Sequence, residues 1–367
     1  MLGMVARFPA LLCITFAAWL SWVSSQAQTP APEHTESTFT NPLLDSGPDP
    51  WVMSRDGWYY YMNTTAVNLT IRKTRDITDL RHAQTKVVWK PPASGPFSKD
   101  IWAPEIHFVN GKWYIYFAAD DGANRTHRIY AIENASADPL SSEWTFKGKV
   151  SDPADKWAID ATVFEHNGEL YMVWSGWPDD RDGAQNLYIA RLKNAWTIDG
   201  KRVRISTPDH PWEQIGDIQF GSSERPPGSP GPRHVNVNEG PEILQHGDKI
   251  FLTYSASGCW TDSYEIGLLE TSASANLLDP NSWKKSPDPV FTGSPAAHAW
   301  SPGHNGFFMS PDGKQNWIIY HANPEAHEGC GNRRSPRAQP FTWNSDGTPN
   351  FGQPVALREP LPKPSGL

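Results

Sequence analysis

Short apolar stretches separated by glycine-containing turns recur along this chain. Five segments share one plan: a polar or acidic start with proline or glycine, an apolar stretch, a turn with glycine, and a returning stretch rich in aromatic residues. Asn-Gly and Asp-Gly between apolar runs favour tight β-hairpins, because the turn needs positive φ at its centre. The plan predicts five hairpins, with turns at Asp56-Gly57, Asn110-Gly111, Asn167-Gly168, His246-Gly247 and Asp312-Gly313.

The spacing of these hairpins predicts the fold class. The turn glycines at positions 57, 111, 168, 247 and 313 are separated by 54, 57, 79 and 66 residues. Further strand-like runs follow the hairpins, and no amphipathic helical pattern of useful length is present. Repeats of this size made of strands predict an all-β, five-bladed β-propeller over residues 38–358. The alternative is a β-sandwich whose turns fall at these spacings by accident.

The two chain ends are expected to meet, because propellers close by pairing the ends in one blade. We expect the run from Phe351 to Val355 to complete the blade that Phe39 to Pro42 begins. Residues 359–367 are then a C-terminal tail.

The N-terminus has the form of a secretory signal. Arg7 supplies the positive charge, Phe8 to Val23 is apolar, and Ser25-Gln26-Ala27 is a small-residue cleavage site. We expect a signal peptide over residues 1–27, a linker over 28–37, and a secreted or periplasmic protein. The alternative is a membrane anchor, for which the apolar run is short.

Composition adds constraints on partners and redox state. The formal net charge is −8 and nothing looks like a clustered basic face, which argues against nucleic acid and anionic membrane as partners. If the chain is cleaved after Ala27, one Arg leaves and the charge becomes −8 − 1 = −9. Of the three cysteines, Cys13 lies in the signal. Cys259 and Cys330 remain, either as a disulfide or as two free buried thiols.

Three carboxylates share one position in the repeats. Asp49, Asp160 and Glu239 each stand eight residues before the turn glycine, while Ala103 holds this position in the second segment and His304-Asn305 holds it in the fifth. The innermost strand of each blade lines the central channel, so these side chains are expected to converge on one funnel. Converging acids perturb one another's pKa, and glycoside hydrolysis needs one carboxylic acid and one carboxylate. The alternative is that Asp and Glu residues at the starts of strands only cap turns.

Two further glutamates lie in these segments. Glu242 is three residues beyond Glu239, so on a regular strand it is expected on the opposite face. Glu105 shares a face with the eight-residue position, and it either lines the funnel more deeply or forms an interior ion pair.

These residues carry a family resemblance. From about Phe39 to Leu357 the chain strongly resembles glycoside hydrolase family 43, five-bladed propellers that hydrolyse arabinose- and xylose-containing polysaccharides with inversion. The motifs are Gly47-Pro-Asp-Pro-Trp, Trp102-Ala-Pro-Glu-Ile, Ile159-Asp-Ala-Thr, Asn238-Glu-Gly-Pro and Arg333-Arg-Ser-Pro-Arg-Ala-Gln.

The resemblance implies roles for these residues. Asp49 would be the general base, Asp160 the pKa modulator and orienter, and Glu239 the general acid. The family often holds Ca²⁺ in the central channel, and His304 fits the place of its protein ligand, with a substrate or acid–base role as the alternative. No cofactor is required for the chemistry.

The overall motif pattern looks most like the exo-acting α-L-arabinofuranosidases. We expect a monomer that acts on plant cell-wall polysaccharide or oligosaccharide. The alternatives are a β-xylosidase or endo-arabinanase of the same family, or a non-catalytic carbohydrate-binding propeller.

Aromatic and arginine side chains are the candidates for sugar binding. Flat aromatic faces stack on the apolar face of a sugar ring. Trp102, Trp51 and Trp174 are the substrate-binding candidates, and packing between blades is the alternative for each. Arg337 would bind sugar hydroxyls with its fork of donors, or form a salt bridge that holds the last blade.

Overall fold

The computed structural model describes residues 1–3, 37–140, 143–218 and 234–367. Most of the predicted signal peptide and linker, residues 4–36, lies outside the described residues, as does the loop from Gly221 to Arg233. The chain divides into two units, Met1–Glu36 and Ser37–Leu367, and the fold described below is that of the second unit. Among the described residues there is no helix of the length and apolarity needed to cross a membrane.

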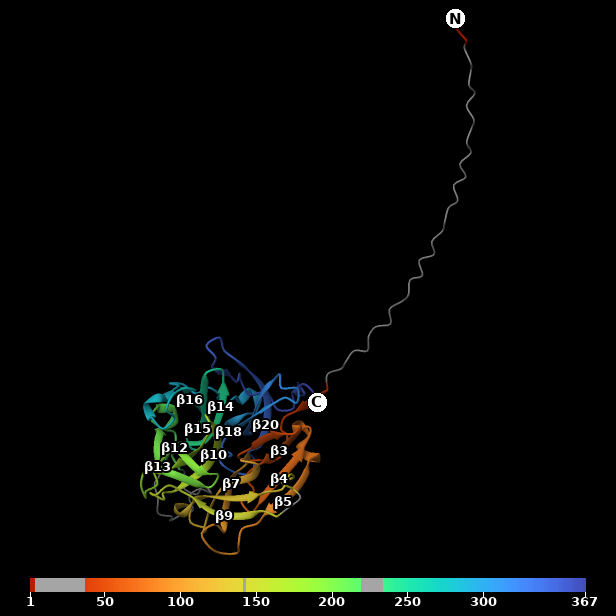
Figure 1. Ribbon diagram of the computed structural model, residues 1–367. Helices are drawn as coiled ribbons and strands as arrows, with labels where there is room; N and C mark the ends of the chain where they lie inside the picture. Colours follow the sequence, from red (N-terminus) through yellow and green to blue (C-terminus); the bar gives the residue numbers. More distant parts are fainter. Residues whose placement is uncertain (4–36, 141–142, 219–233) are drawn as a thin grey trace. The chain divides into compact units, whose positions relative to one another are not determined.

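The second unit is built from strands, as the sequence predicts. Antiparallel four-stranded groups follow one another in chain order, and Figure 1 shows them succeeding each other around the unit. The groups are β2 (Trp51–Arg55), β3 (Trp58–Met62), β4 (Leu69–Thr74) and β5 (Gln84–Trp89); β6 (Lys99–Val109), β7 (Lys112–Asp120), β8 (Arg128–Asn134) and β9 (Thr145–Val150); β10 (Ala158–His166), β11 (Glu169–Gly176), β12 (Ala184–Asn194) and β13 (Thr197–Ser206); β14 (Asn236–His246), β15 (Lys249–Ala256), β16 (Glu265–Ser272) and β17 (Lys284–Lys285); and β18 (Trp300–Met309), β19 (Asn316–Asn323), β20 (Ser335–Trp343) and β21 (Pro349–Asn350).

Helical structure among the described residues is limited to short 3₁₀ segments. They lie in the connections between strands and leave the sheets uninterrupted. They are η1 (Ile77–His82), η2 (Asn124–Thr126), η3 (Pro211–Glu213), η4 (Pro280–Ser282) and η5 (Pro295–Ala297).

The predicted hairpins are present, but two turns differ from the prediction. Asp56 and Gly57 both have positive φ, and the strands on either side pair from Arg55 and Trp58. The Asn-Gly turns at 110–111 and 167–168 have the same form. In the fourth hairpin, however, His246 pairs with Lys249, so the turn residues are Gly247 and Asp248 rather than His246 and Gly247. In the fifth hairpin Met309 pairs with Asn316, so residues 310–315 form a longer connection in which Gly313, but not Asp312, has a positive φ.

Two of the groups are joined edge to edge. A short parallel pairing of Ala184 and Gln185 in β12 with Asn236 and Val237 in β14 links them into one eight-stranded sheet. The other three groups are separate four-stranded sheets. The structure thus differs from five fully separate sheets at this place, because β12 and β14 each extend beyond their hairpin partners.

The closure predicted for the chain ends is wrong in its C-terminal partner. β1 (Thr38–Thr40) pairs with β22 (Pro360–Pro362), whereas the residues before the Phe351 run pair with β20. The residues predicted to be a tail therefore contribute a strand. Phe351 is instead buried among aromatic side chains near Phe291 and Phe341, which explains why its apolar character resembled that of a closing strand.

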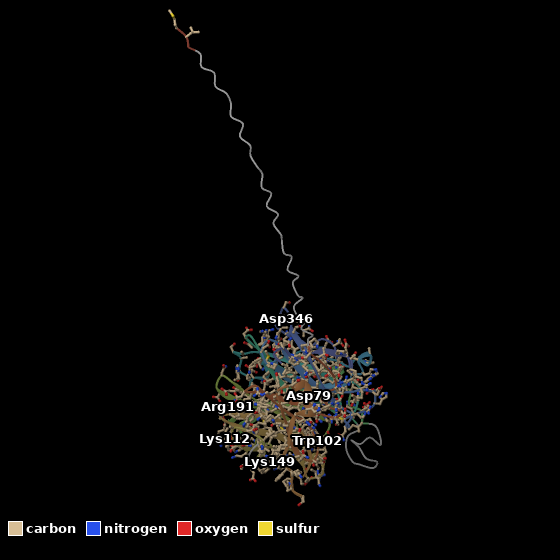
Figure 2. The ribbon with its side chains drawn as sticks, turned by 90° about the vertical axis from the view of Figure 1, so that its right-hand side faces the viewer. Asp79, Trp102, Lys112, Lys149, Arg191 and Asp346 are labelled. Atoms are coloured by element: carbon tan, nitrogen blue, oxygen red, sulfur yellow. A yellow bond between two sulfur atoms is a disulfide. The ribbon has the colours of Figure 1, made fainter. Side chains whose placement is uncertain are left out.

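The core lies between neighbouring sheets. For example, Tyr60 and Ile71 of the first group pack with Trp113, Ile115 and Phe117 of the second in one apolar cluster. Burying an apolar side chain of this size contributes about 1.5–3 kcal/mol. Charged side chains such as Lys112, Lys149 and Arg191, which Figure 2 labels, are 44%, 40% and 45% exposed. The sheets therefore bury both faces and leave their inner strand ends to form a site.

Candidate active site

β-Bulges interrupt the first strand of four groups at equivalent places. At each bulge two residues lie opposite one residue of the neighbouring strand, and the first of the two has a positive φ. A bulge re-aims a side chain and is frequent next to active sites. Asp49, just before β2, has the same conformation. These first residues are Asp49, Ala103, Asp160, Gly240 and His304, with φ of 54°, 41°, 56°, 54° and 46°.

Counting eight residues back from the turn glycine placed Glu239 level with Asp160, but in the structure Glu239 lies one residue before the equivalent position. Before the bulges Ile159 pairs with Ser175 and Glu239 pairs with Ser255 at equivalent places in their hairpins. Gly247 is the first residue of its turn rather than the second, so counting back from it shifts the alignment by one. Gly240 therefore occupies the place of Asp160, and Glu239 stands one residue earlier.

Asp49 is held next to a cation. The Arg334 Nη1 atom donates to Asp49 Oδ1 at 2.8 Å, and both side chains are nearly buried. Burial is the largest single influence and raises the pKa of Asp49, but the Arg334 guanidinium, together with His304, His321 and a hydrogen bond from Thr64, holds the pKa below its usual range. Asp49 is therefore ionised at neutral pH.

Two histidines complete the surroundings of Asp49. The Asp49 backbone N–H donates to His321 Nδ1 at 3.0 Å, which fixes this nitrogen as an acceptor. His304 Nδ1 lies 3.5 Å from Asp49 Oδ1. Burial lowers the pKa of His304, and it lowers that of His321 further. Both rings are therefore neutral at neutral pH, and Arg334 is the cation that stabilises the Asp49 carboxylate.

Asp160 has the opposite electrostatic environment. Burial raises its pKa well above the usual range, and the neighbouring carboxylates of Glu239 and Asp49 raise it further. The Gly240 N–H, which donates to Asp160 Oδ2 at 3.1 Å, offsets part of this effect. The charges of both other carboxylates affect the pKa of Asp160, so the fold brings the three predicted acids together. Of the three, only Asp49 and Asp160 occupy the equivalent positive-φ position.

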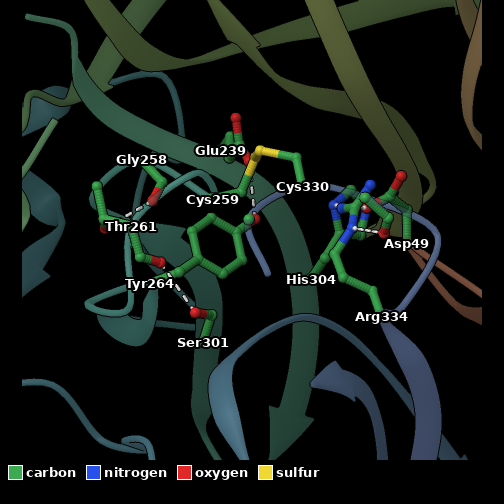
Figure 3. The surroundings of a disulfide bond; sticks show 12 residues. Asp49, Glu239, Gly258, Cys259, Thr261, Tyr264, Ser301, His304, Cys330 and Arg334 are labelled. Carbon is green, nitrogen blue, oxygen red and sulfur yellow. Dashed lines mark hydrogen bonds and ion pairs between the residues drawn. A yellow bond between two sulfur atoms is a disulfide. The ribbon is translucent and has the colours of Figure 1, made fainter. Parts of the chain in front are cut away.

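Glu239 is bound by a tyrosine. The Tyr264 hydroxyl donates to Glu239 Oε1 at 2.8 Å. Burial and the Glu239 carboxylate raise the pKa of Tyr264 well above its usual value, so the hydroxyl keeps its proton and remains a donor. Figure 3 shows Tyr264 beside Glu239, with Arg334, His304 and Asp49 grouped on the other side of the view.

A second pair of acids is buried near Asp160. Burial and Glu242 raise the pKa of Glu105 well above its usual range, with Asp160 adding to the effect, and burial does the same to Glu242. The regular-strand spacing that placed Glu242 on the face opposite Glu239 does not hold, because the bulge at Gly240 and Pro241 adds a residue and shifts the alternation of faces, and Glu242 is buried. Glu105 Oε2 lies 2.9 Å from His107 Nε2. His107 is therefore the interior partner of Glu105, an alternative that the sequence left open.

The predicted sugar-binding side chains lie in different environments. Trp51 and Trp174 are 9% and 2% exposed and belong to apolar clusters, as in the packing alternative. Trp102 stacks on His127, with ring centroids 4.1 Å apart, but it is only half-buried and so keeps an accessible part. Arg337 is fully buried. It has no carboxylate within 4 Å in the part of the chain that the structure describes.

The surroundings of His304 do not favour a cation. Calcium prefers six to eight oxygen ligands, whereas His304 has beside it the Asp49 carboxylate, which is already paired with the Arg334 guanidinium. The metal-ligating group found among the described residues is elsewhere, at Asp209, His210 and Glu213, and there Lys285 Nζ binds both carboxylates. The calcium ion that the resemblance implies at His304 therefore stays a prediction, and we assign no chemistry to it.

Three functional neighbours were not found from the sequence. Arg334 lies in the same arginine-rich motif as Arg337, which was chosen in its place. His321 and Tyr264 carried no sequence signal beyond their positions at strand ends. The disulfide that the sequence left open is formed: Cys259 and Cys330 are bonded, with Cα atoms 5.2 Å apart.

Comparisons with known proteins agree on one family. The family model described as Glycosyl hydrolases family 43 matches residues 39–349. An extracellular exo-α-(1→5)-L-arabinofuranosidase of Streptomyces avermitilis is 40% identical over 362 residues, covering 96% of this chain and 70% of that protein. The α-L-arabinofuranosidase 43 of Humicola insolens is 38% identical, covering 86% of this chain and 64% of that protein.

A solved structure gives the same picture. The crystal structure of an α-L-arabinofuranosidase from Lactobacillus brevis has a TM-score of 0.78 and is 36% identical. The match covers 88% of this chain and 98% of that chain.

Proposed function

Because this chain belongs to the glycosyl hydrolases family 43, we propose that it is a secreted, exo-acting, inverting α-L-arabinofuranosidase that removes terminal arabinofuranosyl residues from arabinan or arabinoxylan. The relatives named above, all arabinofuranosidases and one of them extracellular, support the arabinose preference and the location.

We propose that the four-stranded groups are the five blades of a propeller. The support is that each group has an equivalent positive-φ residue in its first strand or just before it, as expected if five strands line one channel. In this arrangement the eight-stranded sheet is two blades whose inner ends are bridged by the short β12–β14 pairing.

The observation that carries the mechanism is the contrast between the acids. Arg334 helps to keep Asp49 ionised, while burial and the neighbouring carboxylates of Glu239 and Asp49 raise the pKa of Asp160 well above its usual range. A cluster of carboxyl groups whose environments push their pKa values apart marks an acid–base site. An ionised Asp49 is suited to accept a proton from water as the general base.

The remaining roles follow from positions around Asp49. Glu239, oriented by the Tyr264 hydroxyl, protonates the departing glycosidic oxygen as the general acid. Asp160 accepts a hydrogen bond from the Gly240 N–H and interacts electrostatically with Glu239 and Asp49, so it acts as the modulator of their pKa values. Water attacks the anomeric carbon in a single displacement, and the configuration inverts. Two carboxyl groups and water are sufficient, so no cofactor takes part.

Substrate recognition is proposed to use fewer residues than the sequence suggested. Trp102 is the aromatic platform, since it is half-buried rather than enclosed. Arg334, whose side chain beside Asp49 keeps 11% of its surface exposed, is a better candidate than the fully enclosed Arg337 for contacts with sugar hydroxyls.

The proposal is tested by substrate choice and stereochemistry. The purified protein is assayed on nitrophenyl α-L-arabinofuranoside, nitrophenyl β-xyloside and linear arabinan, and NMR follows the first anomer released. We expect arabinose from the first substrate, terminal release from arabinan, and an inverted product. Release from the xyloside alone, internal cleavage of arabinan, or no release from any substrate would support a β-xylosidase, an endo-arabinanase or a non-catalytic binding protein in turn.

Isosteric substitutions test the residue roles. Asp49→Asn and Glu239→Gln should each abolish hydrolysis without loss of the fold, checked by circular dichroism. Asp199→Asn is the matched control, because Asp199 pairs with Arg191 and both side chains are 45% exposed. Near-full activity of either site variant would contradict the assignment while leaving the substrate class untouched.

A further inference from the structure

Two loops meet beside the proposed catalytic acids, and the disulfide joins them. The loop between β15 and β16 carries Cys259 and Tyr264, and the loop between β19 and β20 carries Cys330 and Arg334. Tyr264 binds the proposed acid, and Arg334 binds the proposed base. Figure 3 shows the disulfide between these two sets of residues.

We propose that the Cys259–Cys330 disulfide is a positioning clamp that fixes Tyr264 on Glu239 and Arg334 on Asp49 together, so that the activity depends on its oxidised state. This inference rests on the proposed function and deepens it. Cys259 is five residues before Tyr264, and Cys330 is four residues before Arg334. The bond therefore joins the two side chains through short stretches of chain.

The other links between the two loops are weak. The His327 N–H donates to Asp262 Oδ1 at 2.8 Å, and the His327 ring lies 2.8 Å from the same carboxylate. The His327 side chain is 87% exposed. An exposed ion pair adds little. Among the described residues, the disulfide is therefore the strongest connection from loop to loop.

The Tyr264 ring packs closely against His321 and Gly303. Its ring stacks on His321 with centroids 5.8 Å apart and an interplanar angle of 9°, and His321 accepts from the Asp49 N–H. A Cβ on Gly303 would lie 2.2 Å from the Tyr264 ring, so only glycine permits this approach. Tyr264 thus connects the surroundings of Glu239 to those of Asp49, and a shift of its loop would disturb both.

Arg334 has one anchor that does not depend on the disulfide. Its carbonyl oxygen accepts from the Gly47 N–H at 3.0 Å, two residues before Asp49. Opening the disulfide should therefore loosen the site rather than dismantle it. Because small misplacements of catalytic groups cost up to about 100-fold in rate, we expect a loss of kcat of about tenfold with KM changed less than about twofold.

Reversible reduction of the oxidised protein tests the clamp. Apart from Cys13 in the predicted signal, Cys259 and Cys330 are the only cysteines in the sequence, so a phosphine reductant addresses one bond. The oxidised protein is first shown to release arabinose from nitrophenyl α-L-arabinofuranoside. If it releases none, the proposed function fails rather than the clamp. Activity is then measured after reduction, with thiols counted, and after reoxidation.

Matched variants separate positioning from stability. The double variant Cys259→Ser with Cys330→Ser should have the lowered kcat and be insensitive to reductant. Tyr264→Phe keeps the disulfide but removes the hydroxyl, and its effect should be less than additive with the double variant, because both act on Glu239. Additive effects would overturn the clamp, as would unchanged kcat after complete reduction, or a reduced protein that unfolds at the assay temperature.

Discussion

Replacing Arg334 by Met tests the electrostatic basis of the mechanism. The substitution removes a guanidinium 2.8 Å from Asp49 Oδ1 while keeping a side chain of similar length. At an effective dielectric constant of about 20, two unit charges about 4 Å apart interact by about 4 kcal/mol, equivalent to about three pKa units. Burial, which already raises the pKa of Asp49, is then unopposed by this cation.

The assay is the pH profile of kcat/KM on nitrophenyl α-L-arabinofuranoside, which reports ionisations of the free enzyme. A base must be ionised to act, so the acidic limb should move to higher pH by about 1–3 units in Arg334→Met. Arg333→Met is the matched control, because Arg333 pairs with Glu328 and is 65% exposed. The reasoning is refuted by an acidic limb that stays in place in Arg334→Met or moves equally in the control.

Replacing Arg334 by Met should also lower the stability of the folded protein. A carboxyl group with a lowered folded-state pKa adds stability above its unfolded pKa of about 3.9, and this stability is lost as the pH falls through the folded-state value. Removing Arg334 leaves a buried carboxylate unpaired, which costs about 3–5 kcal/mol. The Tm of Arg334→Met should therefore fall markedly at neutral pH and less in acid.

Three further substitutions test other parts of the site. Asp160→Asn should lower kcat, yet it should raise Tm more at pH 7 than at about pH 4. The folded-state pKa of Asp160 is raised, so this group stabilises the fold below its unfolded-state pKa of about 3.9, and that stability is lost as the pH rises through the folded-state pKa. An equal Tm change at both pH values would contradict this. Gly303→Ala should lose about 1–3 kcal/mol in denaturant unfolding because its Cβ would overlap the Tyr264 ring, whereas Gly331→Ala, with its nearest contact at 3.5 Å, should not. Arg337→Met should leave KM unchanged and keep or raise Tm, since burial lowers the pKa of Arg337 to about 10 and a buried cation without a carboxylate partner is costly; a large rise in KM would restore its predicted substrate role.

The sequence by itself determined the hairpins and the family. A turn such as Asp56-Gly57 depends on local backbone preferences, which a few neighbouring residues fix. Asp49 and Asp160 were found in this way, because their distance from such a turn reflects their place on the strand. The same count reached Glu239 by an offset of one, since Gly247 takes a different place in its turn.

Only the tertiary structure decided which neighbours act on these acids. Arg334 lies 285 residues along the chain from Asp49, and no local pattern separates it from Arg337, which the fold encloses. The bulge that turns Glu242 inward depends on pairing with β15, and the burial of Trp51 and Trp174 depends on the adjacent sheets. The physical reason is that a pKa, or the exposure of a ring, depends on all nearby atoms, and the fold brings these from distant segments.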